Sequence, residues 1–477
     1  MAFILILLPL LMAALAAALP SNRLRPWLLP ATGLAHFALT ALALARPDLT
    51  VSAAWLVLDP LGKLILLVVS TLFLFCSVYA VGYLRARDER PNRIFCVCLM
   101  SFLGLMSLVT WSHHLGLLWV AIEGTTLVTA PLIFFNHTQR SIEATWKYML
   151  VGSVGIALAL LGTFFLAYAA LHAGLEASLT VEDLLKHAPR LSKPWLHAAF
   201  VLLLVGYGTK MGLAPMHTWK PDAYGEAPGV VGAILAGGVT SCAFLALLRA
   251  YHICLAAGEG PYVSRLLLFM GLLSMAVASL FMVGQRDFKR MLAYSSVEHM
   301  GILVLGLGIG STALFGTLLH VVTNGLTKGV LFLSAGNIHR AYGSKSTEQV
   351  CGAMRRLPLS GTLFLDGFLA ITGSPPFGPF ISEFAILNGA FDAGRPAIGG
   401  LFLFLLLVVF IGMGATVLKG VQGRASFAAR NTPYRESWLT GAPIVGLMLL
   451  VLLVGLYLPA PLTRLIRDAA LFLEGQP

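Results

Sequence analysis

Long apolar runs alternate with short polar connections along almost the whole chain. Each run has about 17 to 25 residues, the length at which a helix crosses the ~30 Å hydrocarbon core of a bilayer. The pattern therefore predicts an all-α polytopic membrane protein with about fourteen transmembrane helices. The predicted helices cover residues 2–19, 27–45, 58–84, 93–110, 113–135, 144–171, 197–213, 228–252, 263–284, 292–309, 312–338, 359–392, 397–419 and 438–458.

Two of these helices, the seventh and the twelfth, are interrupted by proline and glycine. The seventh continues into GTKMGLAPMHTWKPDAYGEAPG, which contains Pro215, and the twelfth contains ITGSPPFGPFISEF, with Pro375 and Pro376. Broken helices in matching places are typical of inverted-repeat transporters, whose site lies near the membrane midplane. Because the breaks are five helices apart, an odd number, two tandem units would have opposite orientations. We expect inverted five-helix repeats over about 93–252 and 263–419; two unrelated proline kinks are the alternative.

The composition agrees with a membrane protein that has one domain. Hydrophobic residues make up 58% of the chain and charged residues 11%, whereas soluble domains carry about 25% charged residues. The longest polar segments, about 172–196 and 420–437, have the size of loops. We therefore expect residues 1–477 to form a single membrane domain.

The net charge of +11 comes from basic residues in the short connections between helices. They do not form the basic and aromatic runs of a nucleic-acid-binding surface. Most follow odd-numbered helices, for example Lys220 after the seventh helix and Arg340 after the eleventh, whereas WSHHLG and GIGST on the other side hold no Lys or Arg. By the positive-inside rule, the connections after odd-numbered helices are cytoplasmic and both termini face outward.

Charged side chains occur inside four apolar stretches, at Glu123, Lys210, Lys328 and Glu383. A charge at the bilayer centre costs ~3 kcal/mol or more, so such residues are rare and usually functional. Glu123 has no basic neighbour in its own helix, and Lys210 is its natural partner. A change in that pairing would switch the lysine between holding and releasing a proton. The alternative is a static pair that fixes helix packing.

A second polar group lies in the tenth and eleventh helices. His320, Asn324 and Lys328 follow one another at intervals of four residues and therefore line one stripe of a helix. With His299 nearby, they suit a water-linked proton relay, although a membrane histidine can also be a hydrogen-bonded packing residue. Glu298 and His299 begin the tenth helix, so these two could simply lie at the membrane interface.

Metal and cofactor signals are weak. The six cysteines include no CxxC pair, and most fall inside apolar runs, where cysteine is small apolar filler. We predict no metal site, no cofactor and no redox site of the chain's own.

Several segments resemble the antiporter-like membrane subunits of respiratory complex I. In chain order they are WVAIEGTTL, GTKMGLAPMHTWKPDA, YSSVEHMGI, HVVTNGLTKGVLFLSAG and GSPPFGPFISEF. The same family includes multi-subunit cation/proton antiporters and energy-converting membrane hydrogenases. The resemblance covers roughly residues 55–420. VEHMG and IEATWKYMLVGSVGIALALLGT are most similar to the branch of the family found in formate-hydrogenlyase-type (hydrogenase 4) membrane hydrogenases.

The resemblance implies fourteen helices, inverted repeats over helices 4–8 and 9–13, and a bacterial-type cytoplasmic (inner) membrane. By motif match it places Glu123 as the glutamate of helix 5 and Lys210 as the lysine of helix 7 paired with it. Lys328 with His320 then matches the relay in helix 11, and Glu383 the terminal residue in helix 12.

The chain departs from the family in two places. Many relatives carry a bridging lysine in helix 8, where TSCAFLALLR here places Ser241. Hydroxyl groups and water would have to join Lys210 to Lys328, so this is the weakest step of the relay. The tail PLTRLIRDAALFLEGQP is also too short for the long lateral helix of the largest complex I subunit of this type.

These features predict a proton-translocating membrane subunit of a redox-driven complex, a membrane-bound hydrogenase or complex I relative. Its partners would be other membrane subunits, through them a redox module, and lipid. Two alternatives remain open. One is a subunit of a cation/proton antiporter driven by ion gradients, and the other is a scaffold or bicarbonate-uptake partner whose charges are structural.

Overall fold

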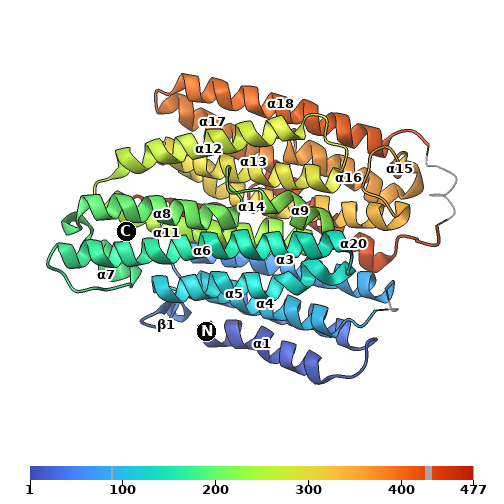
Figure 1. The fold of residues 1–477 in the computed structure, drawn as a ribbon, viewed down its shortest axis with the longest axis horizontal. Helices are drawn as coiled ribbons and strands as arrows, with labels where there is room; N and C mark the ends of the chain where they lie inside the picture. The colour runs from blue at the N-terminus through green and yellow to red at the C-terminus, as the bar shows by residue number, and fades with distance from the viewer. Residues whose placement is uncertain (88–89, 425–431, 476–477) are drawn as a thin grey trace.

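The computed structural model describes residues 1–87, 90–424 and 432–475. Its helices lie side by side along the long axis of the molecule, with α1 (Ala2–Ala18) at one edge and α18 (Pro396–Val421) at the opposite edge (Figure 1). Within the described residues, the only sheet is an antiparallel pair of short strands, β1 (Val51–Ala53) and β2 (Leu56–Val57). The predicted all-α membrane class is confirmed.

The helices before the predicted repeats are α1, η1 (Arg25–Trp27), α2 (Leu28–Ala45), η2 (Pro47–Leu49) and α3 (Pro60–Arg85). The first predicted repeat contains α4 (Arg93–Trp111), α5 (Leu115–Ile133), η3 (Phe134–Asn136), α6 (Gln139–His172), α7 (Val181–Lys186), η4 (Ala188–Arg190), α8 (Lys193–Met211), α9 (Trp219–Glu226), α10 (Gly229–Ile234), the π-helix η5 (Leu235–Val239) and α11 (Thr240–Ala256). The second contains α12 (Gly260–Met282), α13 (Phe288–Ile309), α14 (Ser311–Tyr342), α15 (Ala353–Arg356), α16 (Pro358–Ile371), α17 (Gly378–Asp392) and α18. The chain then continues through α20 (Trp438–Leu456) and the amphipathic α21 (Ala460–Leu473).

Helices occupy every range that the apolar pattern predicted. In the part of the chain that the structure describes, 11 helices are long and apolar enough to cross a membrane. The other three predicted ranges hold α1, α8 and the α16–α17 pair, which do not reach that standard. The count of fourteen spans and the inverted symmetry of the two repeats therefore stay predictions.

Both predicted helix breaks are present, and glycine with proline explains them. The chain leaves α8 at Gly212, whose φ of 80° suits glycine, and leaves α16 near Gly373, with φ of 69°. Pro215 follows the first exit, and Pro375 and Pro376 the second. Proline lacks the backbone N–H that would continue a helix. Each break leaves backbone polar groups inside the bundle, where side chains can reach them.

Candidate functional site

Glu123 lies on α5 and is held by hydroxyl groups. Its Oε2 accepts a hydrogen bond from Thr126 (3.0 Å), one turn along the same helix, and its Oε1 accepts one from Ser153 of α6 (2.9 Å). The carboxyl group is half-buried. Both of its oxygens therefore have neutral partners from the first predicted repeat.

Lys210, in the last turn of α8, is fully buried. Its Nζ donates to the Thr126 hydroxyl and to the Tyr148 hydroxyl (3.1 Å), and it lies 4.8 Å from the centre of the Tyr148 ring. Within the described chain, Glu123 and Lys210 do not form the direct ion pair that we predicted. Thr126 lies between them, accepting from Lys210 and donating to Glu123. The helix positions were right, but a hydroxyl group joins the two charges.

The second predicted repeat holds Lys328 in a similar neutral environment. Lys328, on α14, is fully buried, and its Nζ donates to the Ser295 hydroxyl of α13 (2.7 Å). Asn324, one turn earlier, is also buried, and its Oδ1 has no hydrogen-bond partner among the described residues. The polar stripe of α14 therefore faces α13 inside the bundle.

Three helices bring two histidines and a glutamate together near Lys328. His299 Nδ1 of α13 lies 2.9 Å from His320 Nε2 of α14, and His320 Nδ1 lies 2.9 Å from the Ser382 hydroxyl of α17. Glu383 Oε1, also on α17, lies 4.0 Å from His299 Nδ1. All of these side chains are buried. An imidazole can accept a proton on one nitrogen and release one from the other, so this cluster can pass protons between α13, α14 and α17.

Glu298 belongs to the same region. It is buried rather than interfacial, with 1% of its surface exposed, and its Oε2 lies 3.8 Å from His299 Nε2. This burial argues against the alternative that Glu298 and His299 simply lie at the membrane–water interface.

His299, His320 and Glu383 could also hold a metal ion. Each offers one ligand atom, and these atoms lie within 4.8 Å of one another. Imidazole nitrogen and carboxylate oxygen are common ligands of transition metals. The sequence predicted no metal site, because its cysteines contain no CxxC pair. The three residues of this cluster are far apart in the chain.

Lys220 lies in the connection after the seventh predicted helix, but this connection is not the exposed loop that its sequence suggests. The residue stands on the short helix α9 and is fully buried. The WKPDA segment is polar and proline-containing, which is typical of a loop. Burial of so short a polar helix depends on the surrounding helices, which a local pattern does not show.

Among the described residues, Ser241 of α11, at the position where many relatives carry the bridging lysine, makes no side-chain hydrogen bond to Lys210 or Lys328. Its hydroxyl donates to the Gly237 carbonyl (2.7 Å) in the π-helix η5, one turn earlier. The hydroxyl is therefore satisfied within its own helix segment.

One end of the bundle carries a charge cluster of a different kind. Asp59 Oδ2 lies 3.2 Å from the Arg249 guanidinium and 3.0 Å from His113 Nε2, and Asp59 Oδ1 accepts the backbone N–H of Gly62 at the start of α3. Burial raises the pKa of Asp59, but the charge of Arg249, with His113 and the Gly62 N–H, outweighs it and holds the pKa well below its usual range. Arg249 also donates to the carbonyls of Val109 and Thr110.

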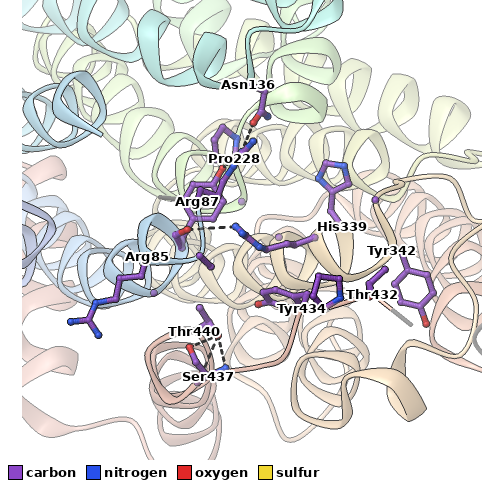
Figure 2. Close-up of a pocket in the computed structure, with 18 of the residues that line it drawn as sticks. Arg85, Arg87, Asn136, Pro228, His339, Tyr342, Thr432, Tyr434, Ser437 and Thr440 are labelled. Atoms are coloured by element: carbon purple, nitrogen blue, oxygen red, sulfur yellow. Dashed lines mark hydrogen bonds between the residues drawn. The ribbon is translucent and has the colours of Figure 1, made fainter. Parts of the chain in front are cut away.

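The opposite end carries a basic cavity of about 1030 Å³. Figure 2 shows Arg85, Arg87, His339 and Tyr434 around it. Its lining comes from segments that follow the third, fifth, seventh, eleventh and thirteenth predicted helices, and its Glu226 is paired with Lys345 (2.6 Å). The odd-numbered connections therefore meet at one end of the bundle, as alternating spans require.

Comparisons with known proteins agree with this architecture. The family model described as NADH:quinone oxidoreductase/Mrp antiporter, transmembrane, matches residues 112–412. The chain is 32% identical to a hydrogenase-4 component F homologue from Methylacidiphilum infernorum over 482 residues, which cover 98% of this chain and 99% of the relative. It is 35% identical to NADH-quinone oxidoreductase subunit N from Desulforudis audaxviator over 343 residues, 71% of this chain and 67% of the relative.

A chain in the structure of the Mrp complex from Dietzia sp. has the same fold. The TM-score is 0.87 at 20% identity, over 99% of this chain and 97% of that chain. The similarities of sequence and fold confirm the resemblance that the motifs carried.

Proposed function

We propose, for a chain that belongs to the NADH:quinone oxidoreductase/Mrp antiporter family of membrane proteins, that it translocates protons as one subunit of a redox-driven membrane complex. Relatives named as components of a hydrogenase and of NADH-quinone oxidoreductase support a redox-driven complex. Electron transfer would take place in other subunits, with which this chain assembles in the membrane.

The observation that carries the proposal is the row of buried titratable groups through both predicted repeats. Lys210, Lys328, His299, His320 and Glu383 are all buried, and their partners are mostly hydroxyl or imidazole groups. Such groups can exchange a proton by small rotations, since each can act as donor and as acceptor. Buried ionisable residues of this kind mark proton relays in membrane proteins.

Glu123, Thr126 and Lys210 form the proposed switch. While Thr126 donates to the Glu123 carboxylate, its oxygen is polarised to accept from the Lys210 ammonium. Protonation of Glu123 would weaken this acceptor and favour release of a proton from Lys210. The released proton would travel toward Lys328.

The second repeat supplies the proposed exit. A proton reaching Lys328 would pass to the His320 and His299 pair and then to Glu383 on the second broken helix. The end with the basic cavity would face the cytoplasm and both chain termini would face outward, because basic connections gather on the cytoplasmic side.

Two variants test the function, Glu123→Ala and Lys210→Ala. We expect either one to abolish proton movement into inverted membrane vesicles, followed with a pH-sensitive dye while the complex oxidises its electron donor. The amount of each subunit in the complex should be unchanged. Glu143→Ala is a matched control, because Glu143 is a carboxylate of α6 paired with Lys147 at the surface (2.6 Å).

Unchanged proton movement in either site variant would exclude this function. A second measurement separates the antiporter alternative: a sodium gradient applied without an electron donor should drive no proton movement. If it does, the chain works as part of a cation/proton antiporter.

A further inference from the structure

The buried Lys220 of α9 is not used by the pathway described so far. Its Nζ donates to the Met211 carbonyl (2.5 Å) and to the Ser296 carbonyl (3.3 Å), and it lies 5.6 Å from the centre of the Tyr224 ring. Among the described residues, no carboxylate forms an ion pair with it. A buried lysine that has only neutral partners loses its proton more easily than an exposed one.

The two carbonyl partners place Lys220 between the halves of the relay. Met211 is the residue directly after Lys210, at the end of α8. Ser296 directly follows Ser295, whose hydroxyl accepts from Lys328. The Lys220 amine therefore contacts the backbone next to Lys210 and the backbone next to Ser295, the hydroxyl partner of Lys328.

Local structure is shaped to admit this side chain. A Cβ atom at Gly212 would lie 2.5 Å from Lys220 Cδ and 3.0 Å from its Nζ. Gly212 thus allows the turn after α8, at φ of 80°, and also leaves room for the lysine. The break in the helix is what brings Lys220 back into the bundle interior.

We propose that Lys220 is the bridging proton carrier between Lys210 and Lys328, in place of the lysine that many relatives carry on the eighth predicted helix, here α11. This inference rests on the proposed proton-translocating function. In each step an ammonium gives one proton, through hydroxyl groups or water, to an amine and itself becomes an amine. Lys210 would protonate neutral Lys220, which would then protonate neutral Lys328, so that the number of charges stays constant.

Lys220 could instead only cap the end of α8, because a lysine that donates to a terminal helix carbonyl stabilises the helix. Two variants separate the roles. Lys220→Met keeps the length of the side chain and removes the titratable amine. Lys220→Arg keeps a positive donor for the Met211 carbonyl, but its guanidinium does not release protons at physiological pH.

We expect both variants to assemble and to lose proton translocation by about 10²-fold, the size of effect typical for loss of a proton-transferring group. The readout is dye-detected proton movement per assembled complex, together with thermal unfolding of the complex in detergent. Lys289→Met is the matched control: Lys289 is also fully buried and donates to a backbone carbonyl, that of Ala227 (2.5 Å). We expect this control to translocate protons at the normal rate.

A third variant moves the amine to helix 8. Lys220→Met combined with Ser241→Lys should recover at least part of the lost proton translocation. Ser241 is buried on α11, the eighth predicted helix, at the position where many relatives carry the bridging lysine. Normal translocation in Lys220→Arg, or equal losses in Lys220→Met and Lys289→Met, would overturn the bridging role. If Glu123→Ala and Lys210→Ala still abolish translocation in that case, the proposed function stands and only the role of Lys220 fails.

Discussion

Buried charges in two regions of this molecule have opposite kinds of partner. At one end of the bundle, Arg249 is paired with Asp59 at 3.2 Å, and the carboxylate also contacts His113 at 3.0 Å. The second region is the central axis, the row of buried groups from Lys210 through Lys328 to Glu383. Here Lys210 and Lys328 donate to hydroxyl groups instead. Among the described residues, neither lysine forms an ion pair with a carboxylate.

The kind of partner separates charged groups that stabilise the fold from charged groups that can transfer protons. In a low-dielectric interior, removing one member of a paired set leaves the other charge uncompensated, so a change of protonation there is costly. A lysine with neutral partners can lose its proton without leaving an unpaired carboxylate behind. The axis therefore tolerates changes of protonation that the Asp59 cluster does not.

The largest expected effect is on stability, from Asp59→Ala. Loss of the carboxylate leaves buried Arg249 without its partner, and such a loss costs about 3–5 kcal/mol. Thermal unfolding of the complex in detergent should show it, whereas proton translocation per assembled complex should stay normal. Loss of translocation with normal stability would contradict the structural role of this cluster.

The same cluster predicts a pH dependence. Because the folded pKa of Asp59 is lowered, its stabilisation is complete above the unfolded pKa of about 3.9. It should decrease as the pH falls below that value toward the folded pKa. Unfolding midpoints of wild type and Asp59→Ala should therefore converge on acidification.

The next largest effect is expected from Lys328→Met. This variant removes a lysine that donates to Ser295 (2.7 Å) and that forms no ion pair with any described carboxylate. Proton translocation should fall by about 10²-fold, with an unfolding midpoint close to that of wild type. A stability loss as large as that of Asp59→Ala would show that the axis lysines are structural too.

The apolar pattern located the helices well because the period and length of a membrane span are local properties. It also located both breaks, since proline and glycine act on their own segment. The burial of Lys220 was not predicted for the same reason: a short polar helix looks like a loop in sequence, and only the helices around it bury its side chains.

The sequence predicted which polar side chains belong to the candidate site, and the structure adds the contacts between them. The sequence identified Glu123 and Lys210, yet Thr126, which joins them, carries no signal that distinguishes it from other threonines of membrane helices. Likewise, His299 and His320 are 21 positions apart, and their 2.9 Å contact depends on how α13 packs on α14. Side-chain contacts between helices follow from packing, which one sequence does not specify.

Thr126→Val tests the hydroxyl bridge with a smaller expected effect. Valine keeps the shape and removes the group that accepts from Lys210 and donates to Glu123. Hydrogen bonds to charged groups contribute about 1.5–3 kcal/mol, and the lower end of this range corresponds to a fall in translocation of about tenfold, which is the effect we expect. Thr126→Ser, which retains the hydroxyl, should be near normal; equal rates in both variants would mean that the two charges communicate without Thr126.

The smallest effect is expected from Ser382→Ala, in the second repeat. Ser382 is 2.9 Å from His320 Nδ1, but His320 also contacts His299 at 2.9 Å, so one link of the cluster survives. A neutral hydrogen bond contributes about 1 kcal/mol, and translocation should fall by no more than about fivefold. Ser334→Ala is the control, since this buried serine of α14 has a hydroxyl without a hydrogen-bond partner among the described residues. A loss in Ser382→Ala as large as that in Thr126→Val would mean that each half of the axis depends on one hydroxyl group of its own. The contact between His299 and His320 would then provide no second route for the proton.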